Sequence, residues 1–127
     1  MNKQKITASK APAEIGAYSN AIRCGNFIFV SGQMPVDPAT GETPPRLAEQ
    51  TKQVIENIRN ILADAGATLD DVVKTTVYLQ EMYLFSQMNE VYAREFHEPY
   101  PARTSMAVKE LPKGALVTLD VVAVVDD

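Results

Sequence analysis

The sequence predicts a single α/β (α+β) domain in which two helices pack on one face of a mixed sheet, with the order ββαβαββ. Three observations support this prediction. The 127 residues match the usual size of one domain, so 1–127 forms one unit. Residues 47–65 and 84–96 repeat apolar side chains with the 3.6-residue period of a helix. Residues 71–79 are rich in β-branched side chains, as strands are.

The first predicted elements are a β-hairpin and a helix. Two strand-like runs, AIRC and FIFVSG, flank Gly25-Asn26, a pair suited to a tight primed turn. Residues 35–45 are rich in Pro, Asp, Thr and Gly, which is typical of a loop. A helix follows from Leu47 to Ala65. Gly66 stands just beyond its end, where glycine is favoured.

The second half adds a strand, a helix and two further strands, at 71–79, 84–96, 104–108 and 116–125. The last strand is apolar on both faces. One face carries Val117, Leu119, Val121, Ala123 and Val125, and the other carries Leu116, Thr118, Asp120, Val122 and Val124. Such a strand is normally buried on both sides, but two helices cover only one face of a sheet. We therefore expect a second subunit to cover the other face.

Composition argues against two kinds of partner. The net charge is −4, the isoelectric point is about 5.0 and the basic residues are scattered, so no nucleic-acid partner is expected. No apolar run approaches the ~20 residues of a membrane helix, so no membrane partner is expected. One cysteine and a basic N-terminus without a following apolar stretch predict a cytoplasmic protein without a secretory signal.

No metal or cofactor is predicted. The chain has one histidine, His97, and one cysteine, Cys24, and neither has carboxylates nearby at metal-ligand spacing. The glycine-rich motifs that bind nucleotides are also missing from the sequence. His97 falls near the end of the second helix, where an imidazole can contact the last carbonyls. Cys24 borders the hairpin turn without a nearby histidine to activate it.

Arg103 is the main candidate for ligand binding. Pro101 disfavours helix before it, and a strand places Arg103, Ser105 and Ala107 on one face. A guanidinium beside small residues and a hydroxyl suits bidentate binding of a carboxylate. A surface charge or a structural Arg–Asp pair is also compatible with this pattern, so both interpretations stay open.

Three further positions are candidates for the site, and two of them, Gly32 and Tyr18, have two interpretations each. Gly32, in the SGQ segment, either allows close approach of a ligand to the backbone or ends a strand. Asn89 lies on the apolar side of the second helix, and its amide needs a partner if it is buried. Tyr18 is either a core aromatic residue or a lid over a pocket.

Together these segments resemble the Rid family of reactive-intermediate deaminases, also called YjgF-type or L-PSP-type proteins. The resemblance runs through nearly the whole chain in order, in APAEIGAYSNAI, VSGQMPVDPATGE, NIRNILADAGATLDDVVKTTVYL, MNEVYAREF, YPARTSMAV and LPKGALVTLDVVAV. It implies a chorismate-mutase-like fold and a homotrimer whose sheets line a barrel-like centre, with ligand clefts between subunits.

The resemblance also implies an activity. Family members hydrolyse 2-imino acids such as 2-iminobutanoate and 2-iminopropanoate, and their enamine tautomers, to 2-keto acids and ammonia, with no metal or cofactor. By position, Arg103 would hold the substrate carboxylate, while Gly32 and Ser105 would supply backbone N–H groups. The cleft would be lined, partly from a neighbouring subunit, by Tyr18, Ser31 and Asn89.

The sequence departs from the family pattern on the last strand. The usual glutamate, which positions or activates the attacking water, aligns with Thr118, and the cysteine usual two residues after the arginine is Ser105. A threonine hydroxyl can orient a water but cannot act as its base near pH 7. By this resemblance the predicted catalytic residues are Arg103, Tyr18 and Thr118, and the deaminase activity is expected to be weak, altered or supported by another group. Asp120 shares the face of Thr118 and is one such candidate, although its position fits the second acidic residue of the family better.

Two other functions stay open. The same trimer and arginine pocket suits a non-catalytic or weakly active binder of small 2-imino or 2-keto carboxylates, acting as a sensor or a regulator of a partner. The replacement of the glutamate by Thr118 favours this alternative. An endoribonuclease or translation inhibitor is the third possibility, and the acidic charge balance argues against it.

Overall fold

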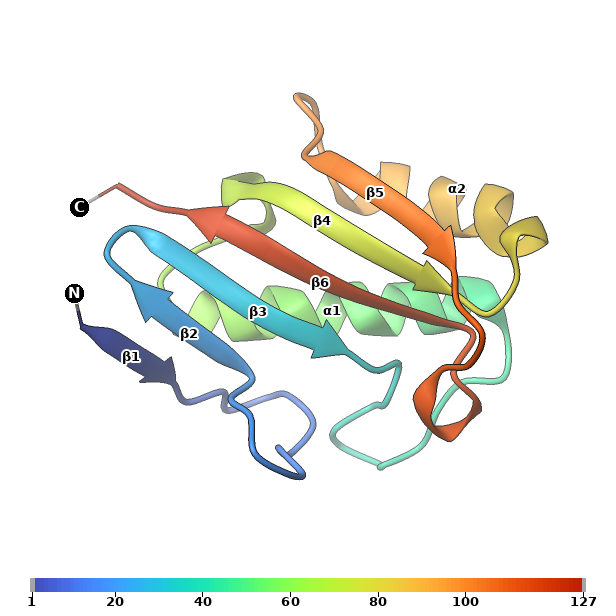
Figure 1. The fold of residues 1–127 in the computed structure, drawn as a ribbon, viewed down its shortest axis with the longest axis horizontal. Helices are drawn as coiled ribbons and strands as arrows, with labels where there is room; N and C mark the ends of the chain where they lie inside the picture. Colours follow the sequence, from blue (N-terminus) through green and yellow to red (C-terminus); the bar gives the residue numbers. More distant parts are fainter. Residues whose placement is uncertain (1, 127) are drawn as a thin grey trace.

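The computed structural model describes residues 2–126, which form one six-stranded sheet with two α-helices behind it (Figure 1). The strands are β1 (Lys3–Ile6), β2 (Ala21–Cys24), β3 (Phe27–Gln33), β4 (Val72–Leu79), β5 (Ala102–Ala107) and β6 (Val117–Val124). The helices are α1 (Leu47–Asp64) and α2 (Phe85–Glu95), with short 3₁₀ turns at η1 (Leu69–Asp71), η2 (Met82–Leu84) and η3 (Pro112–Gly114). The predicted helices and strands are confirmed to within about two residues at each end.

The strand order across the sheet is β1-β2-β3-β6-β4-β5. Only β4 and β5 run parallel, and the other neighbours are antiparallel, so the predicted mixed sheet is confirmed. The expectation of about five strands was wrong by one, because β1 adds an edge strand. Its sequence, KQKI, is exposed at three of four positions and therefore lacks the apolar alternation by which a strand is recognised.

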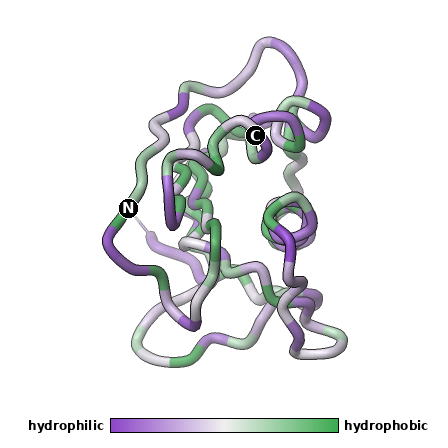
Figure 2. The backbone as a smooth tube through the Cα atoms, turned by 90° about the vertical axis from the view of Figure 1, so that its right-hand side faces the viewer, coloured by the Kyte–Doolittle hydropathy of each residue, from purple (hydrophilic) through white to green (hydrophobic). Residues whose placement is uncertain are grey.

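The core lies between the helices and one face of the sheet. The apolar side of α1 is completely buried, with Val54, Ile55, Ile58, Ile61 and Leu62 at 0% exposure. It packs against the β3 and β6 side chains that face the helices, among them Ile28, Leu119 and Val121. Viewed along the layers, the helices lie on one side of the sheet (Figure 2). The prediction that both helices cover the same face is thus confirmed.

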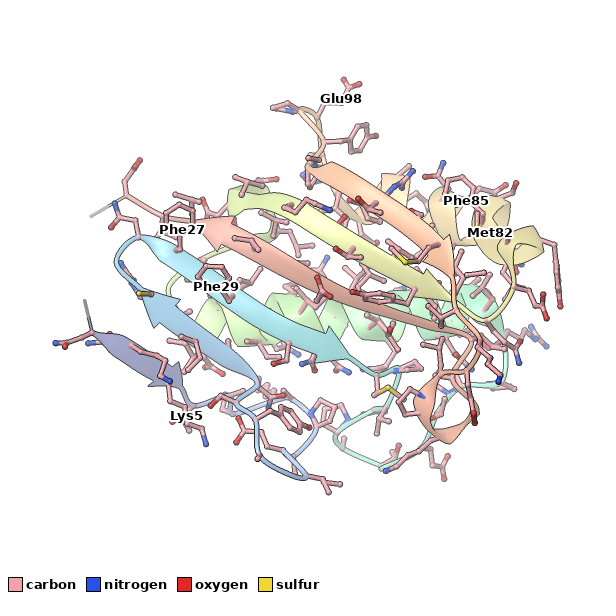
Figure 3. The ribbon with its side chains drawn as sticks, viewed as in Figure 1. Lys5, Phe27, Phe29, Met82, Phe85 and Glu98 are labelled. Carbon is pink, nitrogen blue, oxygen red and sulfur yellow. The ribbon has the colours of Figure 1, made fainter. Side chains whose placement is uncertain are left out.

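The other face of the sheet has no cover within residues 2–126. Phe27 and Phe29 of β3 project from it, with 49% and 47% of their surface exposed and their ring centres 6.1 Å apart (Figure 3). Val122 and Val124 of β6 lie opposite these two rings. The alternation predicted for the last strand is confirmed, because Val117, Leu119 and Val121 are buried under the helices. We call this uncovered surface the open face.

Buried amides on α1 hold the loops that follow β3. The Asn57 amide, at 0% exposure, donates to the carbonyls of Met34 (3.1 Å) and Val36 (2.9 Å). Gln50 donates to the Pro44 carbonyl at 2.8 Å. Because a buried amide is costly to leave unpaired, these bonds fix the path of the chain after β3. Neither α-helix of the described chain is long and apolar enough to cross a membrane.

Candidate functional site

Arg103 lies on β5, an edge strand, with its side chain on the face that α2 covers. Its guanidinium carbon is 4.6 Å from the centre of the Tyr92 ring and 5.2 Å from that of Phe85. Its Nη1 donates to Asn89 Oδ1 at 2.7 Å. Asn89 therefore has the partner that its position on α2 predicted. Within residues 2–126 no carboxylate pairs with Arg103, so the alternative of a structural Arg–Asp pair is wrong.

The sequence of α2 explains how the guanidinium is held. Phe85, Asn89 and Tyr92 stand at i, i+4 and i+7, so one stripe of the helix faces Arg103. Cation–π contacts of this kind contribute about 0.5–2 kcal/mol each. The Tyr92 hydroxyl is 2.8 Å from Thr75 Oγ1 on β4, which fixes the ring. Burial raises the pKa of Tyr92, although the Thr75 hydrogen bond and the Arg103 charge oppose the shift.

A pocket of about 380 Å³ opens beside the guanidinium. Its lining consists of Asn89, Tyr92, Ala93, Tyr100, Pro101 and Arg103. Only one guanidinium N–H has a hydrogen-bond acceptor within the described chain. The remaining donors therefore suit a planar anion, and a carboxylate matches their fork geometry. The sequence located Arg103 and Asn89 but did not identify Phe85 and Tyr92 as the rings that contact the guanidinium. Their i, i+4, i+7 spacing with Asn89 could have indicated them.

Ser105 shares the helix-side face of β5 with Arg103, as predicted. The Val108 N–H donates to the Leu79 carbonyl at 3.0 Å. Because hydrogen bonding alternates along a strand, Thr104 and Met106 also bond to β4, and the Ser105 N–H points out from the free edge. The Ser105 hydroxyl is buried without a hydrogen-bond partner in the described residues. The Ser105 N–H is thus positioned where a ligand beside the sheet edge could accept from it.

Tyr18, Ser31 and Gly32 form a second cluster at the end of β3. Tyr18 is 47% exposed and, together with Gly32, lines a groove of about 740 Å³, so it is a pocket residue and not a core aromatic. A Cβ atom on Gly32 would meet nothing within 4 Å, which leaves the backbone open to close approach. The Ser31 hydroxyl donates to the Ser19 carbonyl at 2.6 Å, so it is bonded to the loop that carries Tyr18.

One chain does not bring the two clusters together. Strands β6 and β4 lie between β3 and β5. With neighbouring strands ~4.8 Å apart, β3 and β5 are separated by about 14 Å. A small carboxylate bound to Arg103 therefore cannot also touch Tyr18 or Gly32 of the same chain.

Thr118 belongs to neither cluster. It pairs across β6 and β4 with Tyr78, which in turn pairs with Met106 of β5, so these three side chains share the open face. Thr118 is 6% exposed and lies on the side of the sheet opposite to Arg103. Asp120 shares this face, as predicted, and accepts from the Tyr78 hydroxyl at 3.1 Å. Burial raises the pKa of Tyr78, and the Asp120 charge adds to the shift.

His97 and Cys24 lie outside both clusters. α2 ends at Glu95 and the chain turns to an extended conformation at Phe96. His97 consequently pairs with Asp70 Oδ1 at 3.1 Å on the surface, and the expected contact with the last helix carbonyls is not made. Cys24 is a half-buried free thiol on β2. Across residues 2–126, no group of three His, Cys, Asp or Glu side chains has a metal-binding arrangement.

Comparisons with known proteins agree on one family. The family model described as Endoribonuclease L-PSP matches residues 8–125. A RutC family protein of Pyrococcus abyssi is 53% identical over 97% of this chain and 98% of its own length. The 2-iminobutanoate/2-iminopropanoate deaminase of Rattus norvegicus is 42% identical over 96% of this chain and 90% of its own.

Solved structures show the same fold. RidA from the Antarctic bacterium Psychrobacter superposes with a TM-score of 0.93 at 42% identity, covering 96% of this chain and 99% of that one. The structure of TdcF from E. coli with bound serine gives a TM-score of 0.92 at 33% identity, covering 97% of this chain and 99% of that one.

Proposed function

The chain belongs to the Rid family of L-PSP-type proteins, and we propose that within it the chain is an imine deaminase. It would hydrolyse 2-imino acids such as 2-iminobutanoate and 2-iminopropanoate to 2-keto acids and ammonia. The observation that carries the proposal is the Arg103 guanidinium, which has unused N–H donors facing a pocket. The rat and bovine relatives, at 42% and 43% identity, are named for this reaction.

The reaction needs little beyond positioning. The substrate is a protonated imine whose carboxylate Arg103 binds through two parallel N–H···O contacts. Water adds to the imine carbon and loses one proton, which gives a tetrahedral carbinolamine. The nitrogen takes up that proton, the C–N bond breaks and ammonia leaves as the C=O bond forms. The hydroxyl proton passes to the departing ammonia, so the products are the 2-keto acid and ammonium. The protein mainly orients carbon and water and manages the protons.

We further propose that the active form is a homotrimer in the cytoplasm, without a nucleic-acid partner. The Tyr18 and Gly32 cluster of one copy would meet Arg103, Asn89 and Ser105 of the next. The separation of about 14 Å between β3 and β5 within one chain supports an intersubunit site. The exposed Phe27 and Phe29 rings support burial of the open face. Light scattering coupled to size-exclusion chromatography should give three times the chain mass.

A turnover assay tests the proposed reaction. An amino-acid oxidase generates the imine, and the protein should speed the release of keto acid above the rate in buffer. Arg103→Ala should lower the added rate by about ten- to a hundredfold, since a hydrogen bond to a charged group contributes about 1.5–3 kcal/mol. Arg94→Ala, a substitution of an exposed arginine on α2, is the matched control. A wild-type protein no faster than buffer would rule out catalysis of these imines.

Thr118 favours a second candidate, a binder of small 2-keto carboxylates without efficient chemistry. No carboxylate stands at this position, and Thr118 faces away from the Arg103 of its own chain. Calorimetry should detect 2-ketobutyrate binding that disappears in Arg103→Ala, with little turnover. Thr118→Glu separates the two candidates, because a large gain in turnover would identify a natural site that lacks its base. RNA cleavage by the purified protein would contradict both.

A further inference from the structure

The loop that carries Tyr18 is closed at its base by a carboxylate. Glu14 Oε2 accepts the Asn20 N–H at 2.6 Å, and Oε1 accepts from Lys5 Nζ at 2.7 Å. Lys5 extends from β1 next to this loop (Figure 3). The Glu14 side chain is only 21% exposed, whereas that of Lys5 is 55% exposed. Glu14 is thus the better-buried partner and the one bonded to the backbone of the loop.

Two buried amides extend this closure to β3. Asn20, at 5% exposure, donates from Nδ2 to the Pro12 carbonyl at 3.0 Å. Gln33, at 3% exposure, donates to Asn20 Oδ1 (3.3 Å) and to the Ser31 carbonyl (3.2 Å). The Ser31 N–H also donates to the Asn20 carbonyl at 2.9 Å. The base of the loop and the end of β3 therefore form one hydrogen-bonded unit.

Tyr18 itself depends on this unit. Its ring is exposed, and its hydroxyl oxygen accepts the Ile15 N–H at 3.3 Å. A phenol that accepts one hydrogen bond still has its own O–H to donate. The loop geometry thus presents a donor at the groove, and no buried packing around the ring would restore its position if the base opened.

We propose that Glu14 is a positioning residue for the deaminase reaction, because it fixes the Tyr18 hydroxyl relative to the Gly32 backbone through Asn20. The inference rests on the proposed function, in which Tyr18 contacts a substrate held by Arg103 of another copy. Displacement of a group by about 1 Å can lower a rate by about a hundredfold. Glu14 therefore controls activity without touching the substrate.

A double-mutant cycle tests the link between Glu14 and Tyr18. Glu14→Ala and Tyr18→Phe should each lower kcat/KM about tenfold, and the double variant should lose no more than either single one. Glu14→Gln should restore part of the loss, since its amide oxygen still accepts from the Asn20 N–H. Lys5→Met is the matched control, because it breaks only the exposed ion pair, and it should stay within about twofold of wild type.

The outcomes separate this inference from the proposed function. Multiplied losses in the double variant, or an unaffected Glu14→Ala, would overturn the positioning role. If wild type does not turn over the imines, the proposed function fails, and the same cycle is then run on the Kd for 2-ketobutyrate. Amide exchange at Asn20 is a readout that needs no ligand. It should accelerate in Glu14→Ala and not in Lys5→Met, and equal protection in the two variants would contradict the inference.

Discussion

The two halves of the candidate site are held by different physical means. The guanidinium of Arg103 is placed by regular elements, with an edge strand beneath it and two aromatic rings and an amide of α2 around it. Tyr18 is placed by a loop whose shape depends on hydrogen bonds to backbone groups. The first arrangement gains energy from ring packing and dispersion, and the second gains it from satisfied polar groups.

This difference predicts how each half fails. A packed cluster loses stability steeply when a ring is removed, because a cavity replaces many contacts. A hydrogen-bonded loop loses less global stability but gains freedom of movement locally, since local opening needs fewer broken contacts. The effects of substitutions in the two halves should therefore differ in both size and kind: a large loss of global stability in one half and a local gain of movement in the other.

The largest effect is expected for Tyr92→Ala. The ring is 3% exposed, stacks on Phe96 with 4.4 Å between ring centres and bonds to Thr75. Its removal should lower the free energy of unfolding by about 3–5 kcal/mol, as for other buried aromatic residues. Urea denaturation measures this loss. Tyr100→Ala, which removes a ring that is 47% exposed beside the same pocket, should cost much less, and similar losses would contradict the packing argument.

A smaller effect is expected for Asn20→Ala in the other half. The substitution leaves the Gln33 amide without its Asn20 acceptor and the Pro12 carbonyl without its donor. Unpaired buried polar groups of this kind cost about 1–3 kcal/mol. Hydrogen exchange should show faster exchange in residues 12–20 and unchanged protection in α1. A loss of protection spread evenly over the whole chain would mean that the loop and the core are one cooperative unit.

The same difference explains what the sequence could predict. The helices and central strands follow from apolar periodicity. The alternation of side chains along β5 and β6 predicts which residues share a face of each strand, so the positions of Arg103, Ser105 and Thr118 were predictable. The Asn89 contact with Arg103 was anticipated only as an amide that needs a partner. The Glu14–Asn20–Gln33 bonds join a loop to the end of β3, and no periodic pattern encodes them. β1 was missed because an exposed edge strand needs no apolar side chains.

The smallest expected effect is a pH dependence confined to the loop half. Hydrogen bonds from Lys5 and from the Asn20 N–H lower the pKa of Glu14 below its ordinary value of 4.5, with burial opposing them. Because the folded-state pKa is the lower one, the carboxylate contributes stability above pH 4.5, and this contribution is lost as the pH falls through the folded-state value. The stability difference between wild type and Glu14→Gln should therefore be constant near neutrality and shrink below pH 4.5.

The Arg103 half supplies the internal comparison for this titration. A tyrosine is neutral throughout the acidic range, and burial moves the pKa of Tyr92, whose ring faces the guanidinium, further upward from its ordinary value of 10.0. Urea midpoints between pH 7 and pH 3 should show the same pH dependence for wild type and Tyr100→Ala.

Lys5→Met removes the largest cause of the lowered Glu14 pKa and should therefore reduce the change in stability between pH 7 and pH 3. An unchanged profile in Lys5→Met would assign the acid sensitivity to carboxylates outside the loop.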